Sequence, residues 1–549
     1  MQADSARALA ASVSLVSLTA PPHSPDMIER VLAIRADRVY TLDESRPDAE
    51  CVAVRDGRVA LAGSVEEVEA AFGGRAEWLD IRPATVTPGL TDSHIHLTEW
   101  ALGRSRPDLS AAASMDEALT LIAQVASAAA HDAWLEFKGW NPVWREEASL
   151  TDLDSAGRGR PVALIAHDMH SGWLSSEAMR RLNIAADRAN PPGGELERDE
   201  SGVPTGVLKE RALDWWYEGR PEASERARRA AILEGQRHLH QLGITGLHSV
   251  EAPPAFAGVE SLARSGELRL RVLHHFPQRF LDHLLECRIA SGLGDEWLRI
   301  GGIKYFSDGA LGSMTAWMLE PYEGSASRGT RRLSSEELRR DVGRARESGL
   351  AATVHAIGDA AVRMTLDAIE AAGSEGLAVP HRIEHLQCVH GDDVRRAAHL
   401  RVVASMQPSH MLTDIPLAEA RWGPRSRRAF ALRSLLDAGT VMAFGSDAPV
   451  EAPDPREGFF AARARQDRNG YPAGGWYPEE RLGGMEVLMG YTVGPAIAAG
   501  GAERRGRLAP GCHADLVAWD IDLVTAEPQR ILEARVLATM VGGEIVYRA

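Results

Sequence analysis

Residues 89–97, with the sequence Gly-Leu-Thr-Asp-Ser-His-Ile-His-Leu, decide the fold of this 549-residue chain. Successive side chains of a β-strand point to opposite faces, so two residues that are two positions apart share a face. His94 and His96 can therefore both point into the interior of a barrel, at the end of its first strand. We predict that this segment is the first of eight strands.

Seven further apolar, strand-like segments follow along the chain, and helix-like segments such as 335–348 and 360–372 lie between them. This alternation of strand and helix is typical of βαβ units and a parallel sheet. Eight such strands are the number in a (β/α)8 TIM barrel, so we predict an α/β protein of that class. The seven segments are Gly246–Val250, Leu270–His274, Ile300–Phe306, Ala352–Ala356, Arg382–Leu386, Val402–Met406 and Val441–Phe444.

The barrel is expected to occupy residues 87–504, with one long interruption after its first strand. Residues 99–235 hold seven of the 13 tryptophans and separate the first strand from the second. We interpret this segment as an insertion that packs as a cap over the barrel. A length of 549 residues alone would suggest three or four domains, but one barrel can account for about 250 residues.

Both ends of the chain carry short β-like segments that are too short to bury a core alone. Asp56-Gly57 marks a hairpin turn in the first of them, because such turns need residues that tolerate positive φ. We predict that residues 28–86 and 505–549 combine into one composite β-sandwich beside the barrel. Residues 1–27 are rich in Ala, Ser and Pro and are expected to be a disordered leader.

Composition excludes several classes of partner. The chain has 61 basic and 77 acidic residues, a net charge of −16. It therefore lacks the basic footprint of a nucleic-acid-binding protein, and we expect no membrane partner either. Four cysteines cannot form a disulfide framework, which favours a cytoplasmic location. We expect a small-molecule partner, with assembly into a homo-oligomer as an open alternative.

Polar side chains stand near the carboxyl ends of four more predicted strands, where the active sites of barrel enzymes form. They are Lys304, His355, His385 and Asp447. Together with the histidine pair of the first strand, these side chains supply nitrogen and oxygen donors suited to Zn²⁺ or a similar divalent metal. A buried structural role would explain any single position, whereas all six in barrel order indicate a metal site.

Several motifs resemble a known family. The segment 88–96 and the ordered lysine, histidines and aspartate are similar to the amidohydrolase superfamily of metal-dependent hydrolases. Four further segments resemble its family 3 branch. This branch is the YtcJ-like proteins, which include N-substituted formamide deformylases. The resemblance extends from about residue 28 to the end of the chain. The four segments are 192–194 (Pro-Gly-Gly), 202–206 (Gly-Val-Pro-Thr-Gly), 306–313 (Phe-Ser-Asp-Gly-Ala-Leu-Gly-Ser) and 355–360 (His-Ala-Ile-Gly-Asp-Ala).

The resemblance implies a role for each matched position. One metal ion would be held by His94, His96 and Asp447, and a second by His355 and His385. Whether one ion or two bind is left open. Lys304, carboxylated on its amine, would bridge the two ions. A carbamate requires a neutral amine first, which a desolvated lysine can supply and arginine cannot. Only three of the 61 basic residues are lysines, which fits a position where arginine cannot substitute.

The implied activity is hydrolysis of a C–N, amide-type bond in a small organic substrate by a metal-activated hydroxide. Asp447 would take the proton of the attacking hydroxide and return it to the leaving nitrogen. An alternative in the same class is a cyclic amide hydrolase or a heterocycle deaminase. An alternative of another class is a non-catalytic metal-binding scaffold or regulatory protein, because fold does not fix function.

Five further residues are weaker candidates. His170 matches a family position in the insertion and is expected to contact substrate. Trp140 and Trp173 are expected to line the pocket, although they could equally hold the cap together. Asp308 and Asp359 could orient the metal ligands through hydrogen bonds, and Asp359 could instead cap the next helix.

Overall fold

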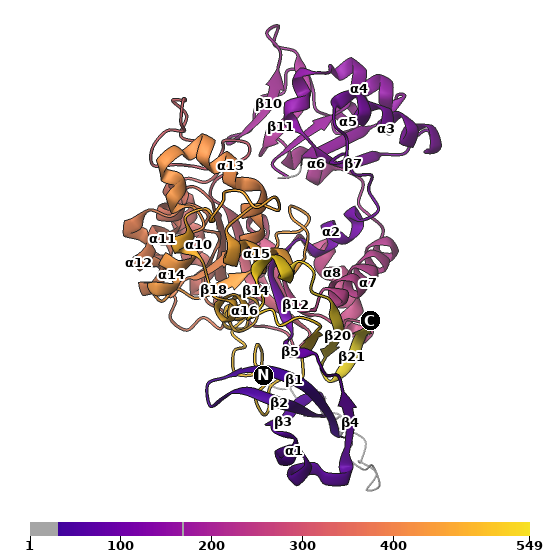
Figure 1. The fold of residues 1–549 in the computed structure, drawn as a ribbon. Helices are drawn as coiled ribbons and strands as arrows, with labels where there is room; N and C mark the ends of the chain where they lie inside the picture. The colour runs from indigo at the N-terminus through magenta and orange to yellow at the C-terminus, as the bar shows by residue number, and fades with distance from the viewer. Residues whose placement is uncertain (1–30, 167–168) are drawn as a thin grey trace, which may run out of the picture.

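Eight parallel strands form a barrel at the centre of the computed structural model, which describes residues 31–166 and 169–549 (Figure 1). The strands neighbour one another in chain order, and an isolated parallel bridge between Ile95 and Ala448 brings the last strand next to the first. The predicted (β/α)8 architecture is confirmed. The strands are β6 (Leu90–Ile95), β12 (Ile244–Val250), β13 (Arg271–Pro277), β14 (Leu298–Phe306), β15 (Ala351–Ala356), β16 (Arg382–His385), β17 (Val403–Met406) and β18 (Met442–Phe444).

Amphipathic helices cover the outside of the barrel. In α10 (Ser335–Glu347), the N-cap Ser334 and Glu337 form a capping box, which satisfies backbone N–H groups of the first turn. Leu338, Val342 and Ala345 of this helix are buried, and their spacing of three and four places them on one face. The other barrel helices include α8 (Pro253–Arg264), α9 (Leu281–Glu286), α11 (Asp359–Ala372), α12 (Gly391–His399), α13 (Met411–Trp422), α14 (Leu432–Asp437), α15 (Pro455–Ala464), α16 (Gly484–Tyr491) and α17 (Val493–Ala498).

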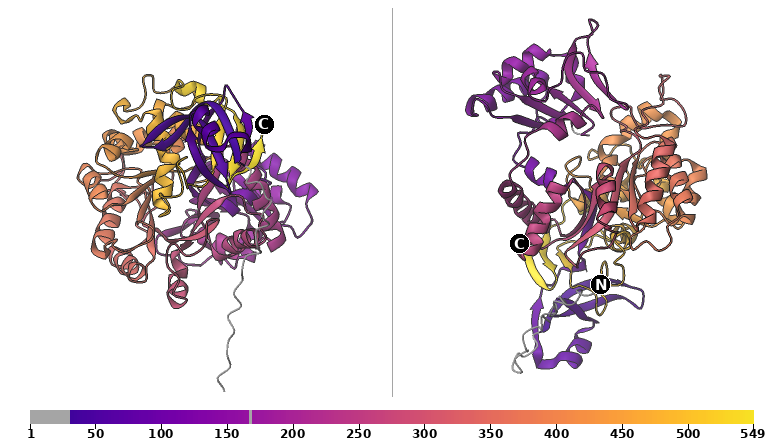
Figure 2. Two further views of the ribbon diagram at one scale, coloured as in Figure 1. Left: turned by 90° about the horizontal axis from the view of Figure 1, so that it is seen from below. Right: turned by 180° about the vertical axis from the view of Figure 1, so that it is seen from behind.

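Strands from both ends of the chain share one eight-stranded sheet, which lies beyond the amino ends of the barrel strands (Figures 1 and 2). Antiparallel pairing of β5 with β19 joins the two halves. Asp56 and Gly57 both have positive φ, as the predicted hairpin turn requires. The predicted leader lies outside the described residues. The sheet contains β1 (Val31–Asp43), β2 (Arg46–Arg55), β3 (Arg58–Gly63), β4 (Ala76–Asp80), β5 (Thr85–Pro88), β19 (Leu516–Trp519), β20 (Val536–Val541) and β21 (Glu544–Arg548).

The long segment after β6 forms a separate lobe with its own five-stranded sheet (Figure 1). The ends of this segment belong to the barrel, because α2 (Leu97–Gly103) packs against α7 (Glu225–Gln241) through Trp100 and Gly235. The lobe stands beyond the carboxyl end of the barrel (Figure 2). It contains β7 (Leu135–Trp140), β8 (Val162–Ala166), β9 (Ser171–Leu174), β10 (Gly194–Arg198), β11 (Pro204–Glu210), α3 (Met115–Ala128), α4 (Leu150–Gly157), α5 (Ser176–Arg181) and α6 (Asp214–Gly219).

Within the two described ranges, no helix combines the length and the apolar character needed to cross a membrane.

Candidate metal centre and active site

Six predicted side chains come from the carboxyl ends of five barrel strands. His94 and His96 come from β6 and the residue after it, Lys304 from β14, His355 from β15 and His385 from β16, while Asp447 follows β18. All are buried except His96, which is half-buried. Parallel strands place these ends at one face of the barrel, so residues up to 353 positions apart in the chain become neighbours.

Three of the imidazoles have their tautomer set by the group that faces Nδ1. A ring nitrogen that donates a proton to a fixed acceptor leaves the other nitrogen with a free lone pair. His94, His96 and His385 therefore each present Nε2 as an acceptor. The acceptors that face their Nδ1 atoms are the Glu384 carboxylate for His94, the Val250 carbonyl at 2.9 Å for His96 and the Gln407 side-chain oxygen at 2.8 Å for His385.

Asp447 completes a group of converging acceptors. Its Oδ1 atom lies 3.2 Å from Nε2 of His96 and 3.4 Å from Nε2 of His94, yet this buried atom accepts no hydrogen bond from the described residues. Ligands on a tetrahedral zinc ion lie about 3.3–3.5 Å apart, given bonds of about 2.0–2.2 Å. Ligand atoms of His94, His385 and Asp447 lie within 4.8 Å of one another. The residues present therefore fit a divalent metal ion.

This grouping differs in one respect from the division that the family resemblance implies. Among the described residues, His385 belongs with His94 and Asp447 to one group whose ligand atoms are close enough to hold a single ion. The resemblance instead assigned His385 to a second ion together with His355. The rings of His385 and His355 are in edge contact, with centroids 4.6 Å apart, so His385 lies between the two implied ion positions.

Lys304 is buried at the centre of this group. Its Nζ lies 3.2 Å from Nε2 of His94, and it stands over the ring of Phe306 at 4.8 Å. Burial lowers the pKa of Lys304 to about 8, although Glu384 and Asp447 act in the opposite direction. A lysine with this pKa has a substantial neutral fraction near physiological pH, which is the form that reacts with CO₂.

The backbone is strained at two of the predicted ligands. His385 has φ of 70° and Asp447 has φ of 59°, both in the left-handed region. Non-glycine residues seldom adopt this region, and Asp and His are among those that tolerate it best. Such strain is found where the surrounding structure holds a side chain in a required direction, as at a catalytic or metal site.

His355 and Asp308 form a second layer of contacts next to the ligand group. Nε2 of His355 lies 3.0 Å from the Gly309 carbonyl oxygen and 3.4 Å from Oδ1 of Asp308. Nδ1 of His355 is therefore the nitrogen that is free to bind an ion. Burial raises the pKa of Asp308 to about 7, even though its carboxyl accepts backbone hydrogen bonds from Trp317, Ile357 and Gly358. Asp308 thus fixes the loops beside His355.

A fully buried ion pair that the sequence analysis missed supports His94. Arg382 donates to both carboxylate oxygens of Glu384, at 2.5 and 3.1 Å, and Glu384 contacts Nδ1 of His94. The Arg382 guanidinium also donates to the Ser93 carbonyl oxygen and the Ser405 hydroxyl. Both charged residues stand two positions apart in β16 and share its inner face. A charged pair inside a strand expected to be buried was the available signal.

Asp92 was also missed, and it joins the first and last strands of the barrel. It accepts hydrogen bonds from the backbone N–H groups of His94 and Ser446, each at 3.1 Å, and from the Ser446 hydroxyl at 2.6 Å. Burial raises the pKa of Asp92 to about 6. Ser446 is adjacent to Asp447, so Asp92 positions two of the ligand-bearing segments at once.

His170 is the one predicted residue that the lobe brings to the barrel. Its ring centroid lies 5.6 Å from that of His355, and its Nδ1 lies 3.0 Å from Oε2 of Glu210. Glu210, another residue missed by the sequence analysis, also contacts Thr315 and Arg332 of a barrel loop. The pair His170–Glu210 therefore connects the lobe to the metal face.

Three predicted residues lie away from the ligand group. Trp140 and Trp173 pack together in the hydrophobic core of the lobe, with ring centroids 5.8 Å apart, and both are at most 1% exposed. This placement corresponds to the structural alternative and does not support substrate contact. Asp359 accepts a hydrogen bond from the Leu319 backbone, and the N-cap of α11 is Gly358, so the capping role suggested for Asp359 is wrong.

Comparisons with known proteins agree with this geometry. The putative amidohydrolase YtcJ of Bacillus subtilis (strain 168) is 30% identical, over 93% of this chain and 98% of that protein. An N-substituted formamide deformylase of Arthrobacter pascens is 28% identical, over 94% and 98%. A solved structure of an uncharacterized metal-dependent hydrolase from Pyrococcus horikoshii OT3 superposes with a TM-score of 0.74 at 26% identity, covering 91% of this chain and 99% of that one.

The family match and the relatives support a hydrolase that acts on carbon–nitrogen bonds. The sequence model of the amidohydrolase family matches residues 77–547. The chain belongs to this family.

Proposed function

We propose that this protein is a metal-dependent amidohydrolase that cleaves an amide-type C–N bond of a small organic molecule. The observation that carries the proposal is the convergence of acceptor atoms from His94, His96, His385 and Asp447 at the carboxyl end of the barrel. Lone pairs and a carboxylate oxygen that converge on one point repel one another, and a divalent cation at that point removes the repulsion.

Zinc is the ion we expect, because imidazole nitrogens and a carboxylate oxygen are its usual ligands in hydrolases. When bound, such an ion would polarise the scissile carbonyl and lower the pKa of a water molecule towards about 7. One or two ions are compatible with this proposal. In the arrangement with two ions, His355 would contribute Nδ1 and Lys304 would be carboxylated on Nζ.

Asp447 is the group we assign to proton transfer. Burial by itself would raise the pKa of Asp447, but positive charge at the ligand group, on a metal ion or on a protonated imidazole, lowers it well below its ordinary value. The carboxylate is therefore ionised at neutral pH and can accept a proton from the attacking water. Returning that proton to the departing nitrogen allows the amine to leave in neutral form.

His170 is the residue we assign to the substrate, because it faces His355 from the lobe. The contact of Glu210 with Nδ1 orients the imidazole of His170 beside His355. We place N-formyl and N-acyl amines first among substrates, on the strength of the relative that is named as a formamide deformylase. Cyclic amides are the next class to test.

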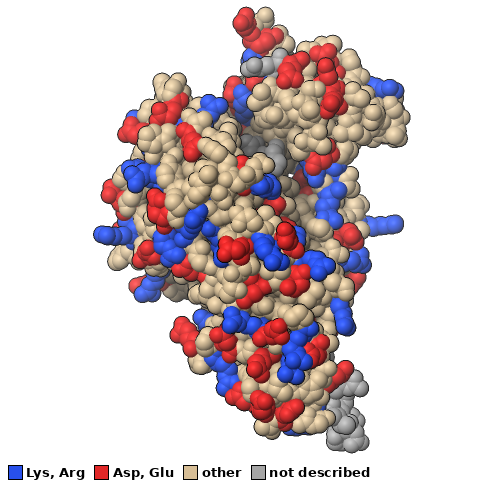
Figure 3. Space-filling model, in the orientation of Figure 1, with Lys and Arg blue, Asp and Glu red and all other residues tan. Residues whose placement is uncertain are grey.

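The same proposal includes a cytoplasmic location and a small-molecule partner. No disulfide joins the four cysteines, all of which lie in the described ranges, and this fits a reducing compartment. Figure 3 shows basic and acidic side chains intermixed over the face that it displays. With a net charge of −16, such a surface is poorly suited to nucleic acid.

A substrate panel tests the proposal. The protein is stripped of metal with a chelator, reloaded with zinc, and assayed with N-formyl amines, N-acyl amines and cyclic amides. We expect zinc-dependent release of amine from at least one open-chain amide, with loss of turnover after chelation. Hydrolysis that is unaffected by chelation, or tight zinc binding without turnover of any member, would contradict it.

A further inference from the structure

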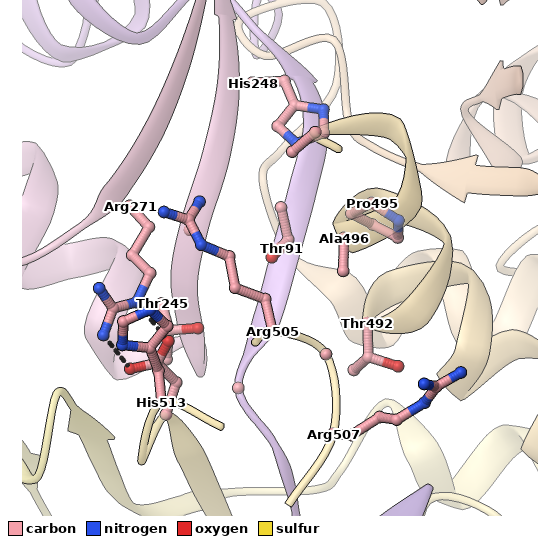
Figure 4. Close-up of a pocket in the computed structure, with 15 residues that line it drawn as sticks. Thr91, Thr245, His248, Arg271, Thr492, Pro495, Ala496, Arg505, Arg507 and His513 are labelled. Carbon is pink, nitrogen blue, oxygen red and sulfur yellow. Dashed lines mark hydrogen bonds and ion pairs between the residues drawn. The ribbon is translucent and has the colours of Figure 1, made fainter. Parts of the chain in front are cut away.

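A polar cavity lies at the end of the barrel opposite the ligand group, where the strands begin (Figure 4). It lies between the starts of β6, β12 and β13 and the segment 492–515, and it is partly open to solvent. Its volume of about 30 Å³ is enough for about two water molecules. The cavity can therefore hold a small ion, and it is too small for an organic substrate.

Basic side chains dominate the lining of this cavity. Arg271, Arg505 and Arg507 line it, whereas Asp515 is its only acidic residue within the described ranges. Asp515 is already engaged, because Arg271 donates to both of its oxygens, at 2.5 and 2.9 Å. This bidentate pair compensates one guanidinium and leaves the other two without a carboxylate in the lining.

Arg505 leaves most of its hydrogen-bonding capacity unused. Figure 4 shows its side chain reaching up between Arg271 and Thr91. Of its five N–H donors, the described contacts use one, from Nη2 to the Glu296 backbone oxygen at 2.6 Å. Burial, with the nearby positive charge of Arg271, lowers the pKa of Arg505 to about 10, so the guanidinium is still charged at neutral pH.

The surroundings add no carboxylate that is free for Arg505. The Glu296 carboxylate, which is half exposed, lies 3.7 Å from Arg271, 3.2 Å from His513 and 3.9 Å from Arg58. Nε of Arg507 is buried without a hydrogen-bond partner in the described part of the chain. Arg299, which also lowers the pKa of Arg505, adds a further positive charge.

His248 adds a donor at the upper end of the cavity in Figure 4. Its Nδ1 lies 2.7 Å from Nη1 of Arg382, which can only donate, so Nδ1 accepts and Nε2 carries the proton. Buried charges in proteins are paired, and buried donors left unsatisfied destabilise the fold. Arg505 and Arg507 are half-buried, and the excess of guanidinium groups and N–H donors around this small space favours an acceptor that carries negative charge.

We propose that this cavity binds one small inorganic anion, a halide or a small oxyanion, held by Arg505 with Arg271 and His248. The anion would join the segment after α17 to the floor of the barrel. The cavity is built from residues outside the ligand group at the carboxyl end, so the anion would stabilise the fold without taking part in hydrolysis.

Thermal unfolding tests the proposal on the full chain. The wild-type protein is compared in sodium chloride, in sodium phosphate and in sodium gluconate at equal ionic strength, since gluconate is too large for the cavity. We expect chloride or phosphate to raise the Tm by about 2–4 °C over gluconate. A chloride effect identifies a halide site and a phosphate effect identifies an oxyanion site. Equal Tm values in all three salts would overturn the proposal.

Arg505→Met should abolish the difference between salts, because it removes the charge and the donors while keeping much of the apolar stem. Arg237→Met is the matched control, since Arg237 is a largely exposed arginine of α7, and it should keep the wild-type response. An anion effect that survives in Arg505→Met would contradict the assignment.

A crystallographic measurement avoids reliance on a variant that could fail to fold. Wild-type crystals are grown in bromide and, separately, in sulfate. We expect an anomalous bromide peak or tetrahedral sulfate density between Arg271 and Arg505. Absence of both from the cavity would overturn the proposal.

Discussion

The two ends of the barrel gather polar groups of opposite kind. At the carboxyl end, acceptor atoms of His94, His385 and Asp447 lie within 4.8 Å of one another. At the amino end, the guanidinium groups of Arg271 and Arg505 and the N–H of His248 line a cavity whose acidic residue is already paired. Acceptor atoms converge at the first end, and donors converge at the second.

This difference shows that the kind of ion each end of the barrel can bind depends on which hydrogen-bonding groups are left unpaired. The residue types alone do not predict it. Histidine occurs at both ends. At the carboxyl end, Nδ1 of His96 and of His385 donates and Nε2 presents a lone pair, whereas Nδ1 of His248 accepts from Arg382 and Nε2 is a donor. The neighbour that fixes the tautomer decides whether the imidazole suits a cation or an anion.

The largest effect is expected for Asp447→Asn, which keeps the size of the side chain and removes its charge. The variant loses both a metal ligand and the proton acceptor, so we expect kcat/KM to fall by on the order of 10⁴-fold. Steady-state assays with the zinc-loaded protein measure this. Asp393→Asn, at a buried aspartate that pairs with Arg363 and Arg396 on the barrel surface, should retain activity. Near-wild-type kcat/KM in Asp447→Asn would break the assignment.

Lys304→Arg tests whether the carboxyl end needs a neutral amine or only a positive charge. A guanidinium cannot form a carbamate and would repel divalent ions, so we expect about 1000-fold lower activity and less bound metal by elemental analysis. Lys209→Arg is the control, because Lys209 makes surface ion pairs with Glu195 and Glu197 that arginine can also make. A fully metallated, active Lys304→Arg protein would show that Lys304 acts as a structural cation.

Glu384→Gln tests whether the buried ion pair sets the tautomer of His94. The amide can present its N–H to Nδ1 and reverse the tautomer, so we expect zinc affinity to fall by about 10- to 100-fold. Competition with a chromophoric chelator measures the affinity directly, without an activity assay. Glu480→Gln, at a buried glutamate that accepts from Ser434, should bind zinc normally. Unchanged zinc affinity in Glu384→Gln would show that the Arg382–Glu384 pair does not set the tautomer of His94.

The smallest effect is a pH dependence of metal loading in the presence of bicarbonate. With a pKa of about 8, about one Lys304 amine in ten is neutral at pH 7 and about nine in ten at pH 9. Because this pKa is lowered, protonation of Lys304 below about pH 8 disfavours the folded metal-free protein, and this penalty fades as the pH rises. The neutral amine and bicarbonate form the carbamate and water, so we expect loading at equilibrium, with a fixed bicarbonate concentration and limiting zinc, to rise about ninefold from pH 7 to 9 by elemental analysis. Loading that falls over this interval would contradict a carbamate.

The barrel could be predicted from the sequence because its signals are local. Each strand is a short apolar run between helical segments, and all eight runs correspond to strands of the barrel. The six ligand candidates could be found as well, since chain order and position at a strand end place them on one face. The same reasoning could not assign His385 to one ion or the other, because that depends on distances across the barrel.

The lobe shows where such reasoning stops. Its richness in tryptophan suggested a lining for the pocket, yet Trp140 and Trp173 lie in the core of the lobe. The composition of a segment indicates how much apolar area it can bury. It does not indicate whether that area faces the core of the lobe or the substrate pocket. Glu210, by contrast, has no local signal, and it meets His170 only because β11 pairs with β9.

The sequence by itself determined the fold class, the order of the strands and the set of metal-ligand candidates, because periodicity and chain order are local properties. Tertiary structure decided which nitrogen of each imidazole is free, how far Asp447 stands from His94 and His96, and which charges are left unpaired at each end of the barrel. These outcomes depend on contacts between residues hundreds of positions apart, such as Glu384 with His94. Hydrogen bonds and Coulomb interactions act over a few ångströms in space, so separation along the chain carries little information about them.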